Sequence, residues 1–303
     1  MKHILLILIL ASTALGAAAQ QFGCSWIALG SADSTSQVWF RRTYVSASRP
    51  RQAFITIAST GFFTLYVNGR NVSRAVRTPS RAATDTLARS MTFRIDRFLR
   101  PDTNTIAVWY SPTFPRIERR QISVCLHGTY ASGSTFAHWS DGSWQCRRAN
   151  MSLTGGGGEC QQSADNSMPW WKAGTEAALW QAASEEEGRQ GESVASCPWG
   201  AQGSVATHIM APRYFDTEPD GVAYDFAPGF HGIVRITLRG CTPGEHINVD
   251  GLKYTCSGDN DEQAFRRFTT TFRRKVLVSG DSRFSPEQIQ SVEAVEIADA
   301  PAF

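Results

Sequence analysis

Short runs of alternating apolar and polar residues follow one another through the first half of the chain, with turn residues between them. Residues 53–59, 63–67, 91–95 and 105–110 are such runs. Asn68-Gly69 directly follows the second run and is the dipeptide best suited to a two-residue type I′ hairpin turn. Strands of this length at this spacing predict an antiparallel β-sandwich, which we place at residues 20–185.

A second series of strand-like runs occupies the last third of the chain. Residues 221–226, 232–238, 246–249 and 252–256 alternate in the same way, and Asp250-Gly251 separates the last two as a hairpin turn. We therefore expect a second β-sandwich at residues 204–303, joined to the first by a polar, charged linker at 186–203. The predicted fold class is all-β, with two tandem antiparallel β-sandwiches, and no long run has the 3.6-residue period of a helix.

The first 19 residues differ from the rest and have the pattern of a secretory signal peptide. Lys2 precedes an apolar stretch at 4–10, and Ala17-Ala18-Ala19 offers a cleavage site. We expect a protein that is secreted or periplasmic. Cys24 raises the alternative of a lipid anchor, but the preceding Gln21-Phe22-Gly23 lacks the aliphatic residue of a lipobox. No other apolar run approaches the roughly 18 residues that span a bilayer, so no transmembrane segment is predicted.

Charge and cysteine content narrow the function classes. The net charge is only +3, and the arginines are spread without an aromatic platform, so nucleic acid is not an expected partner. Seven cysteines follow the signal, and their odd number leaves at least one unpaired within the chain. No CxxC or histidine spacing predicts zinc. Cys125 with His127 suggests a thiol nucleophile, although two alternate residues of a strand share a face without any catalytic role.

Several segments in a fixed order resemble the N-terminal β-sandwich domains of bacterial α-L-rhamnosidases. The segments that carry the resemblance are 65–69, 93–99, 104–108, 141–144 and 224–235. The resemblance implies that the first sandwich is a jelly roll of the galactose-binding-like type. It also implies that the chain is related to the ancillary part of a glycoside hydrolase, because the catalytic carboxylates of that family lie on a large α/α barrel after the sandwiches.

Tryptophans beside carboxylates indicate a carbohydrate site in the middle of the chain. Sugar rings pack their apolar faces on flat aromatic rings, while their hydroxyls need carboxylates and amides as partners. The candidate carbohydrate-binding residues are Trp139, Asp141, Trp144, Glu159, Asp165, Trp170 and Trp171. The alternative is that these tryptophans pack in the core or between domains, as aromatic residues of sandwiches commonly do.

These observations predict a non-catalytic carbohydrate-binding protein of an exported glycan-degrading system, with glycans, among them rhamnose-containing ones, as the expected partner. One alternative is an α-L-rhamnosidase-type glycoside hydrolase, or a split or truncated piece of one. Another is a structural protein of the cell surface. No catalytic residue and no cofactor is predicted. The acidic turn 257–262 suggests Ca²⁺, but it lacks the spacing of an EF-hand loop, and we prefer to interpret it as an exposed, charged hairpin turn.

Overall fold

The computed structural model describes residues 25–80, 87–115, 119–162, 169–172, 177–186, 194–197 and 203–299. The predicted signal peptide, Cys24 and Asp165 lie outside these residues. The described chain is almost entirely strand, as the alternating pattern predicted, and the all-β fold class is confirmed. Its helical residues are short 3-10 turns, at η1 (Asp96–Phe98), η3 (Ala177–Leu179) and η4 (Pro286–Gln288).

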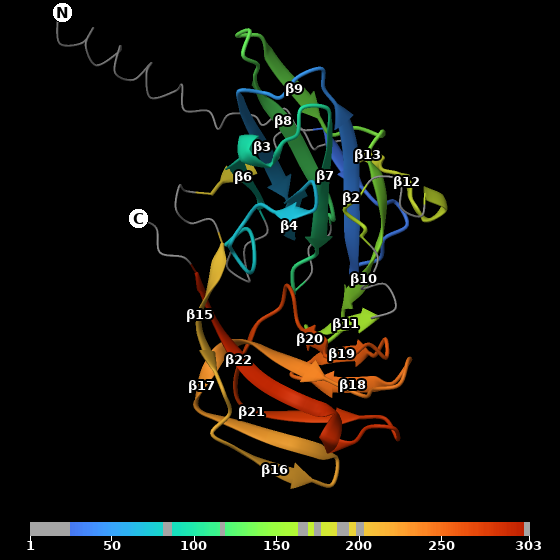
Figure 1. Cartoon of the computed structure of the whole chain (residues 1–303), viewed down its shortest axis with the longest axis vertical. Coiled ribbons are helices and arrows are strands. Elements are labelled where there is room, and N and C mark those ends of the chain that lie inside the picture. The colour runs from blue at the N-terminus through green and yellow to red at the C-terminus, as the bar shows by residue number, and fades with distance from the viewer. Residues whose placement is uncertain are drawn as a thin grey trace, which may run out of the picture.

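Strands between residues 26 and 196 form two facing sheets, drawn in blue to yellow in the upper part of Figure 1. One sheet contains, in spatial order, β13 (Ser184–Glu186), β1 (Trp26–Ala28), β8 (Ile122–Thr129), β3 (Gln52–Ser59), β6 (Ala88–Arg94) and β14 (Val194–Ser196), with β9 (Thr135–Trp139) beside β8. The facing sheet contains β10 (Gln145–Leu153), β2 (Ser36–Val45), β7 (Thr103–Ser111), β4 (Phe62–Val67) and β5 (Arg70–Asn71), with β12 (Gln181–Ala182) beside β10. Alternate residues of both sheets, such as Ile55 and Val108, fill the space between them.

The second half of the chain forms its own sandwich around the long strand β17 (Gly221–Leu238). The pairing of β17 with β21 shifts in register between Asp225 and Phe230, and the parts of β17 before and after this shift pair with different further strands. The first half pairs with β16 (Tyr214–Glu218), and the second half pairs with β22 (Ile289–Asp299) and β20 (Glu262–Phe265). The remaining strands are β15 (Ser204–Met210), β18 (His246–Val249), β19 (Leu252–Thr255) and β21 (Thr271–Gly280).

Both predicted hairpin turns are confirmed. Asn68 and Gly69 have φ angles of 52° and 80°, and Asp250 and Gly251 have 47° and 77°. A type I′ turn needs positive φ at both central residues, which Asn, Asp and Gly adopt at low cost. The turns fix the pairing of β4 with β5 and of β18 with β19.

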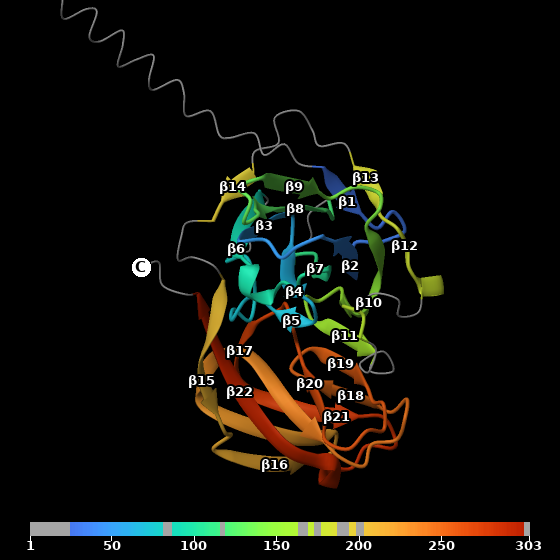
Figure 2. The ribbon, with the colours of Figure 1, turned by 45° about the horizontal axis from the view of Figure 1, so that its top comes forward.

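A short strand joins the two sandwiches into one structure. β11 (Glu159–Gln162) pairs antiparallel with β10 of the first sandwich and parallel with β19 of the second. The result is a continuous 15-stranded sheet that crosses the junction, where β11 lies beside β19 in Figures 1 and 2. Part of the expected linker at 186–203 also belongs to the sheets, because Glu186 ends β13 and Val194–Ser196 forms β14.

Candidate functional site

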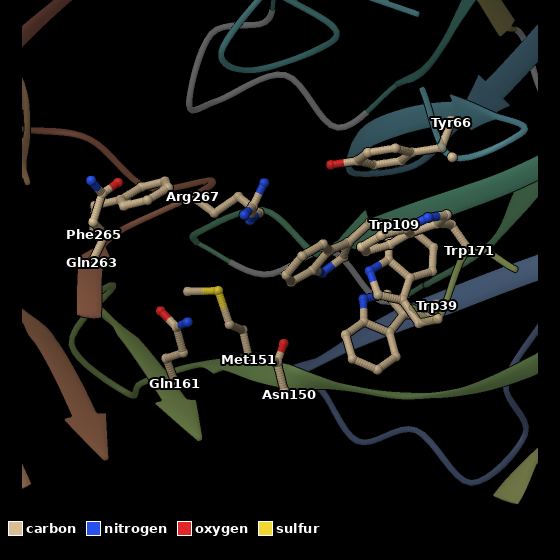
Figure 3. A pocket seen from close by; sticks show the side chains of 12 residues that line it. Trp39, Tyr66, Trp109, Asn150, Met151, Gln161, Trp171, Gln263, Phe265 and Arg267 are labelled. Atoms are coloured by element: carbon tan, nitrogen blue, oxygen red, sulfur yellow. The ribbon is translucent and has the colours of Figure 1, made fainter. Parts of the chain in front are cut away.

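A hollow of ≈ 360 Å³ lies where the outer face of the first sandwich meets the second sandwich (Figure 3). Aromatic side chains cover one side of it, and amides with one guanidinium cover the other. The lining side chains are Trp39, Tyr66, Trp109, Trp170 and Trp171, then Asn150, Gln161, Gln263 and Arg267, with Met151 and Phe265 between them. We call this the aromatic hollow.

Strand alternation places the aromatic wall. In β2, Val38 and Phe40 point into the core of the first sandwich, so Trp39 between them points outward toward the second sandwich. Trp109 lies directly opposite Trp39 in β7, and their rings meet edge to face with centroids 5.5 Å apart. Tyr66 extends this outward aromatic surface onto β4.

Trp170 is the centre of the aromatic wall. Its ring stacks on Trp39 with centroids 5.1 Å apart and an interplanar angle of 3°, and Tyr66, Trp109 and Trp171 meet it edge to face. The buried guanidinium of Arg41 donates to the carbonyl oxygens of Trp170 and Lys172, at 3.4 and 2.5 Å. These contacts hold the short segment 169–172 against the sheet.

Trp171 and Tyr66 present the accessible part of this wall. Both are half-buried, and their rings stack with centroids 6.1 Å apart. The backbone of Gly69 comes so close that an added Cβ would lie 2.8 Å from the Trp171 ring. The hairpin turn therefore sets the position of Trp171 as well as the register of β4 and β5.

The opposite side of the aromatic hollow supplies hydrogen-bonding groups. Arg267 places its guanidinium 4.3 Å from the centroid of the Trp109 ring, while the amides come from β10, β11 and β20. None of the described lining residues is Asp or Glu. Amides both donate to and accept from hydroxyl groups, so this lining suits a polyhydroxylated ligand with apolar ring faces. It lacks, among the described residues, the pair of carboxylates that glycoside hydrolysis needs.

The seven candidate carbohydrate-binding residues predicted from the sequence do not lie together in the structure. Trp170 and Trp171 line the aromatic hollow. Trp144 is fully buried in the core of the first sandwich, as the packing alternative describes. Trp139 is 38% exposed on β9 and lines no part of the hollow. Asp165 lies outside the described residues.

Asp141 and Glu159 are both engaged within the protein. Asp141 pairs with Arg42 and accepts hydrogen bonds from Ser143; burial raises its pKa, but these contacts outweigh burial and hold the pKa below its usual value. Glu159 is fully buried, and its two oxygens accept the backbone N–H groups of residues 267–269 at 2.7–2.8 Å. Glu159 therefore positions Arg267 from behind and does not face the hollow.

Sequence reasoning did not select Trp39, Tyr66, Trp109 or Arg267. Tyr66 and Trp109 lie inside runs correctly predicted as strands, so their outward orientation could be read from alternation with Leu65 and Val108. What the sequence did not reveal is that a second sandwich faces this side of the sheet.

The other candidate groups from the sequence are a cysteine thiol and the carboxylates of an acidic turn. Burial raises the pKa of the Cys125 thiol to about 11, so almost none of it is thiolate at neutral pH. Cys125, Cys146, Cys160, Cys241 and Cys256 are free thiols. In the described part of the chain, no group of three His, Cys, Asp or Glu residues is arranged to hold a metal ion. In the acidic turn, Glu262 accepts hydrogen bonds from Tyr254, Ser257 and Gly258. Among the described residues, no helix has the length and apolar character of a membrane span.

Comparison with known proteins identifies the relatives of this architecture. Residues 48–198 match the family model of the alpha-L-rhamnosidase N-terminal domain. The alpha-L-rhamnosidases of Dictyoglumus thermophilum and Aspergillus terreus superpose with TM-scores of 0.79 and 0.78, at 18% and 20% identity over 93% and 92% of this chain. The Streptomyces avermitilis enzyme complexed with L-rhamnose gives 0.74 at 18% identity over 88%. No curated protein matches the sequence.

The likeness extends over both sandwiches but over a minor part of each relative. The chain spans 36% of the first two enzymes and 29% of the third. At this level of identity the superpositions establish the shared fold of the two sandwiches.

Proposed function

Residues 48–198 form an alpha-L-rhamnosidase N-terminal domain, and we propose that the chain is a non-catalytic carbohydrate-binding protein of an exported glycan-degrading system. The observation that carries this proposal is the aromatic hollow, in which stacked aromatic rings face amides and a guanidinium. The signal-like pattern of residues 1–19 supports export to the periplasm or beyond.

The aromatic wall accounts for the apolar part of a sugar. Trp171 and Tyr66 are held in place by Trp170 and Gly69 before any ligand arrives, so little side-chain entropy is lost on binding. Rhamnose carries a methyl group in place of the hydroxymethyl group of most hexoses. Met151 and Phe265 offer an apolar surface for such a methyl group.

The polar wall accounts for the hydroxyl groups. Asn150, Gln161 and Gln263 each carry one acceptor and two donor positions, and Arg267 adds donors only. Because the described lining contains no carboxylate, the hollow favours binding over hydrolysis. Because the apolar surface described above suits the methyl group of rhamnose, rhamnose-containing glycans are the first ligands to examine.

Calorimetry of the mature chain with L-rhamnose and rhamnose-containing oligosaccharides tests the proposal, with hydrolysis of an aryl rhamnoside followed on the same sample. We expect binding without turnover. Trp171→Ala should weaken binding about tenfold or more, since about 1.4 kcal/mol is well within the value of a stacked ring. Trp139→Ala is the matched control, because Trp139 is accessible but outside the hollow. Turnover, or equal affinity of the Trp171→Ala variant, would contradict the proposal.

A further inference from the structure

A second hollow of ≈ 350 Å³ adjoins the aromatic hollow, and Asn150 and Met151 line both. The two meet where the pairing of β2 with β10 shifts between Arg148 and Ser152, a local irregularity that re-aims side chains of β10. We call the second one the polar hollow; Asp33, Gln37, Arg147, Arg148 and Gln162 are among its lining residues. We call the two adjacent hollows together the groove.

Two contacts tie the walls of the groove together. The indole N–H of Trp109, in the aromatic hollow, donates to the side-chain oxygen of Gln37, in the polar hollow, at 2.8 Å. The guanidinium of Arg147 lies 5.4 Å from the centroid of the Trp39 ring. The same side chains thus support both hollows, and a ligand in one would lie beside the other.

The groove offers hydrogen-bond donors in excess. The side-chain nitrogens of Gln37 and Trp39 are buried without a hydrogen-bond partner, although both residues are at least 99% buried. The oxygen of Gln37 is held by Trp109, so its nitrogen is fixed as the group that needs an acceptor. Both nitrogens lie just beneath the lining, where their unmatched donor groups favour a ligand rich in acceptor oxygens.

The charges of the groove favour the same kind of ligand. Among its described lining residues, Arg147, Arg148 and Arg267 are the cations and Asp33 is the carboxylate. That carboxylate accepts hydrogen bonds from Thr35 and Ser36 and pairs with Arg148 at 3.1 Å, contacts that hold the pKa of Asp33 well below its usual range. Among the described lining residues, guanidinium groups therefore outnumber carboxylates, which favours an anionic ligand.

From the shared lining, the unmatched donors and the charge excess, we infer that the groove binds an acidic oligosaccharide. A neutral sugar stacks on Trp171 and Tyr66, and the carboxylate of a neighbouring uronic-acid residue meets Arg147 in the polar hollow. A guanidinium is well suited to a carboxylate because it donates two parallel hydrogen bonds. This inference rests on the proposed function and adds to it the chemical class of the glycan.

The experiment compares one disaccharide of rhamnose and a uronic acid with the same disaccharide after its carboxyl group has been reduced to a hydroxymethyl group. Calorimetry with the mature chain should show about tenfold tighter binding of the acidic form, as expected for a charge-assisted hydrogen bond. High salt should reduce the difference. Arg147→Gln should bring the two affinities close together, and Arg147→Lys should retain part of the difference.

Arg94→Gln is the matched control, because Arg94 is an exposed arginine of β6 paired with Asp96 and lines neither hollow. Equal binding of the two disaccharides would overturn this inference and leave the proposed function intact. A difference that survives Arg147→Gln would overturn the assignment to the polar hollow. Absence of binding by both disaccharides would overturn the inference and the proposed function together.

Discussion

The carboxylate of Glu159 accepts a hydrogen bond of 2.7 Å from the backbone N–H of Phe268, a residue 109 positions later in the chain. Arg267 and Thr269 donate to the same carboxylate, so one buried side chain of the first sandwich satisfies three consecutive amides of the second. The neighbouring side chain of Arg267 is thereby fixed over Trp109. The junction and the wall of the aromatic hollow depend on the same contact.

Glu159→Gln should therefore destabilise the whole described structure. The variant places an NH₂ donor against backbone N–H donors in a fully buried position, and we expect a loss of about 2 kcal/mol or more in the free energy of unfolding. Urea denaturation measures it. Glu296→Gln, at a more exposed carboxylate paired with His208, should change stability by less than about 0.5 kcal/mol. Similar losses in the two variants would contradict this role of Glu159.

Trp170→Ala should lower the free energy of unfolding, in addition to any effect on ligand binding. Trp170 is only 3% exposed and contacts four other aromatic rings, so its removal leaves a large cavity at the junction. We expect a loss of about 3–5 kcal/mol, measured by thermal or urea unfolding. A loss below about 1 kcal/mol would show that the segment 169–172 does not stabilise the sheet.

Gly69→Ala tests how the turn positions Trp171. Alanine at φ +80° is strained, and its Cβ would also clash with the Trp171 ring. Gly244→Ala is a matched control, because Gly244 has φ +79° and open space around it. We expect both variants to lose about 1 kcal/mol, and Gly69→Ala to lose more and to change tryptophan fluorescence. Equal losses with unchanged fluorescence would argue against the close contact.

His127 should make stability depend on pH. Burial lowers its pKa below the ordinary value of 6.5, and its ring stacks on Phe54 with one nitrogen 3.2 Å from the Thr56 hydroxyl. The unfolded chain then binds the proton at higher pH than the folded chain. The free energy of unfolding therefore has its highest value above the pKa of His127 in the unfolded chain. It falls as the pH decreases from there through the lower pKa of His127 in the folded chain.

Urea midpoints measured at intervals from about pH 8 to about pH 5 test this sign. The variant His127→Gln should show a smaller decline over this range than the unmodified chain, whatever its stability at pH 8. His208→Gln, which changes an exposed histidine of the second sandwich, serves as control. An unchanged slope in His127→Gln would exclude His127 as the titrating group.

The strands and turns of this protein could be predicted because their causes are local. The run at 63–67 appears as Phe62–Val67, and Asn68-Gly69 forms the expected turn, since alternation and positive φ are properties of a few neighbouring residues. The parallel pairing of β11 with β19 has no such local signal. It joins residues about ninety positions apart, and neither strand is distinctive alone.

The site was harder to predict for a related reason. Composition marks tryptophans and carboxylates but does not show which face of a sheet is covered by another domain. Trp144 and Trp170 are both buried, yet one fills the core of the first sandwich and the other faces the junction. Glu159 carries the charge of a ligand-binding residue, but its partners are backbone amides more than a hundred residues away.

The pairing of β11 with β19 also protects the protein from self-association. If the chain were cut between residues 186 and 203, the natural boundary by sequence, β19 would lose its neighbour and become an edge strand. The backbone N–H and C=O groups of Leu252–Thr255 that now face β11 would then be open to strand addition by another copy. Each sandwich thus pairs with a strand of the other that would otherwise be an exposed edge strand, so the two sandwiches are best expressed as a single chain.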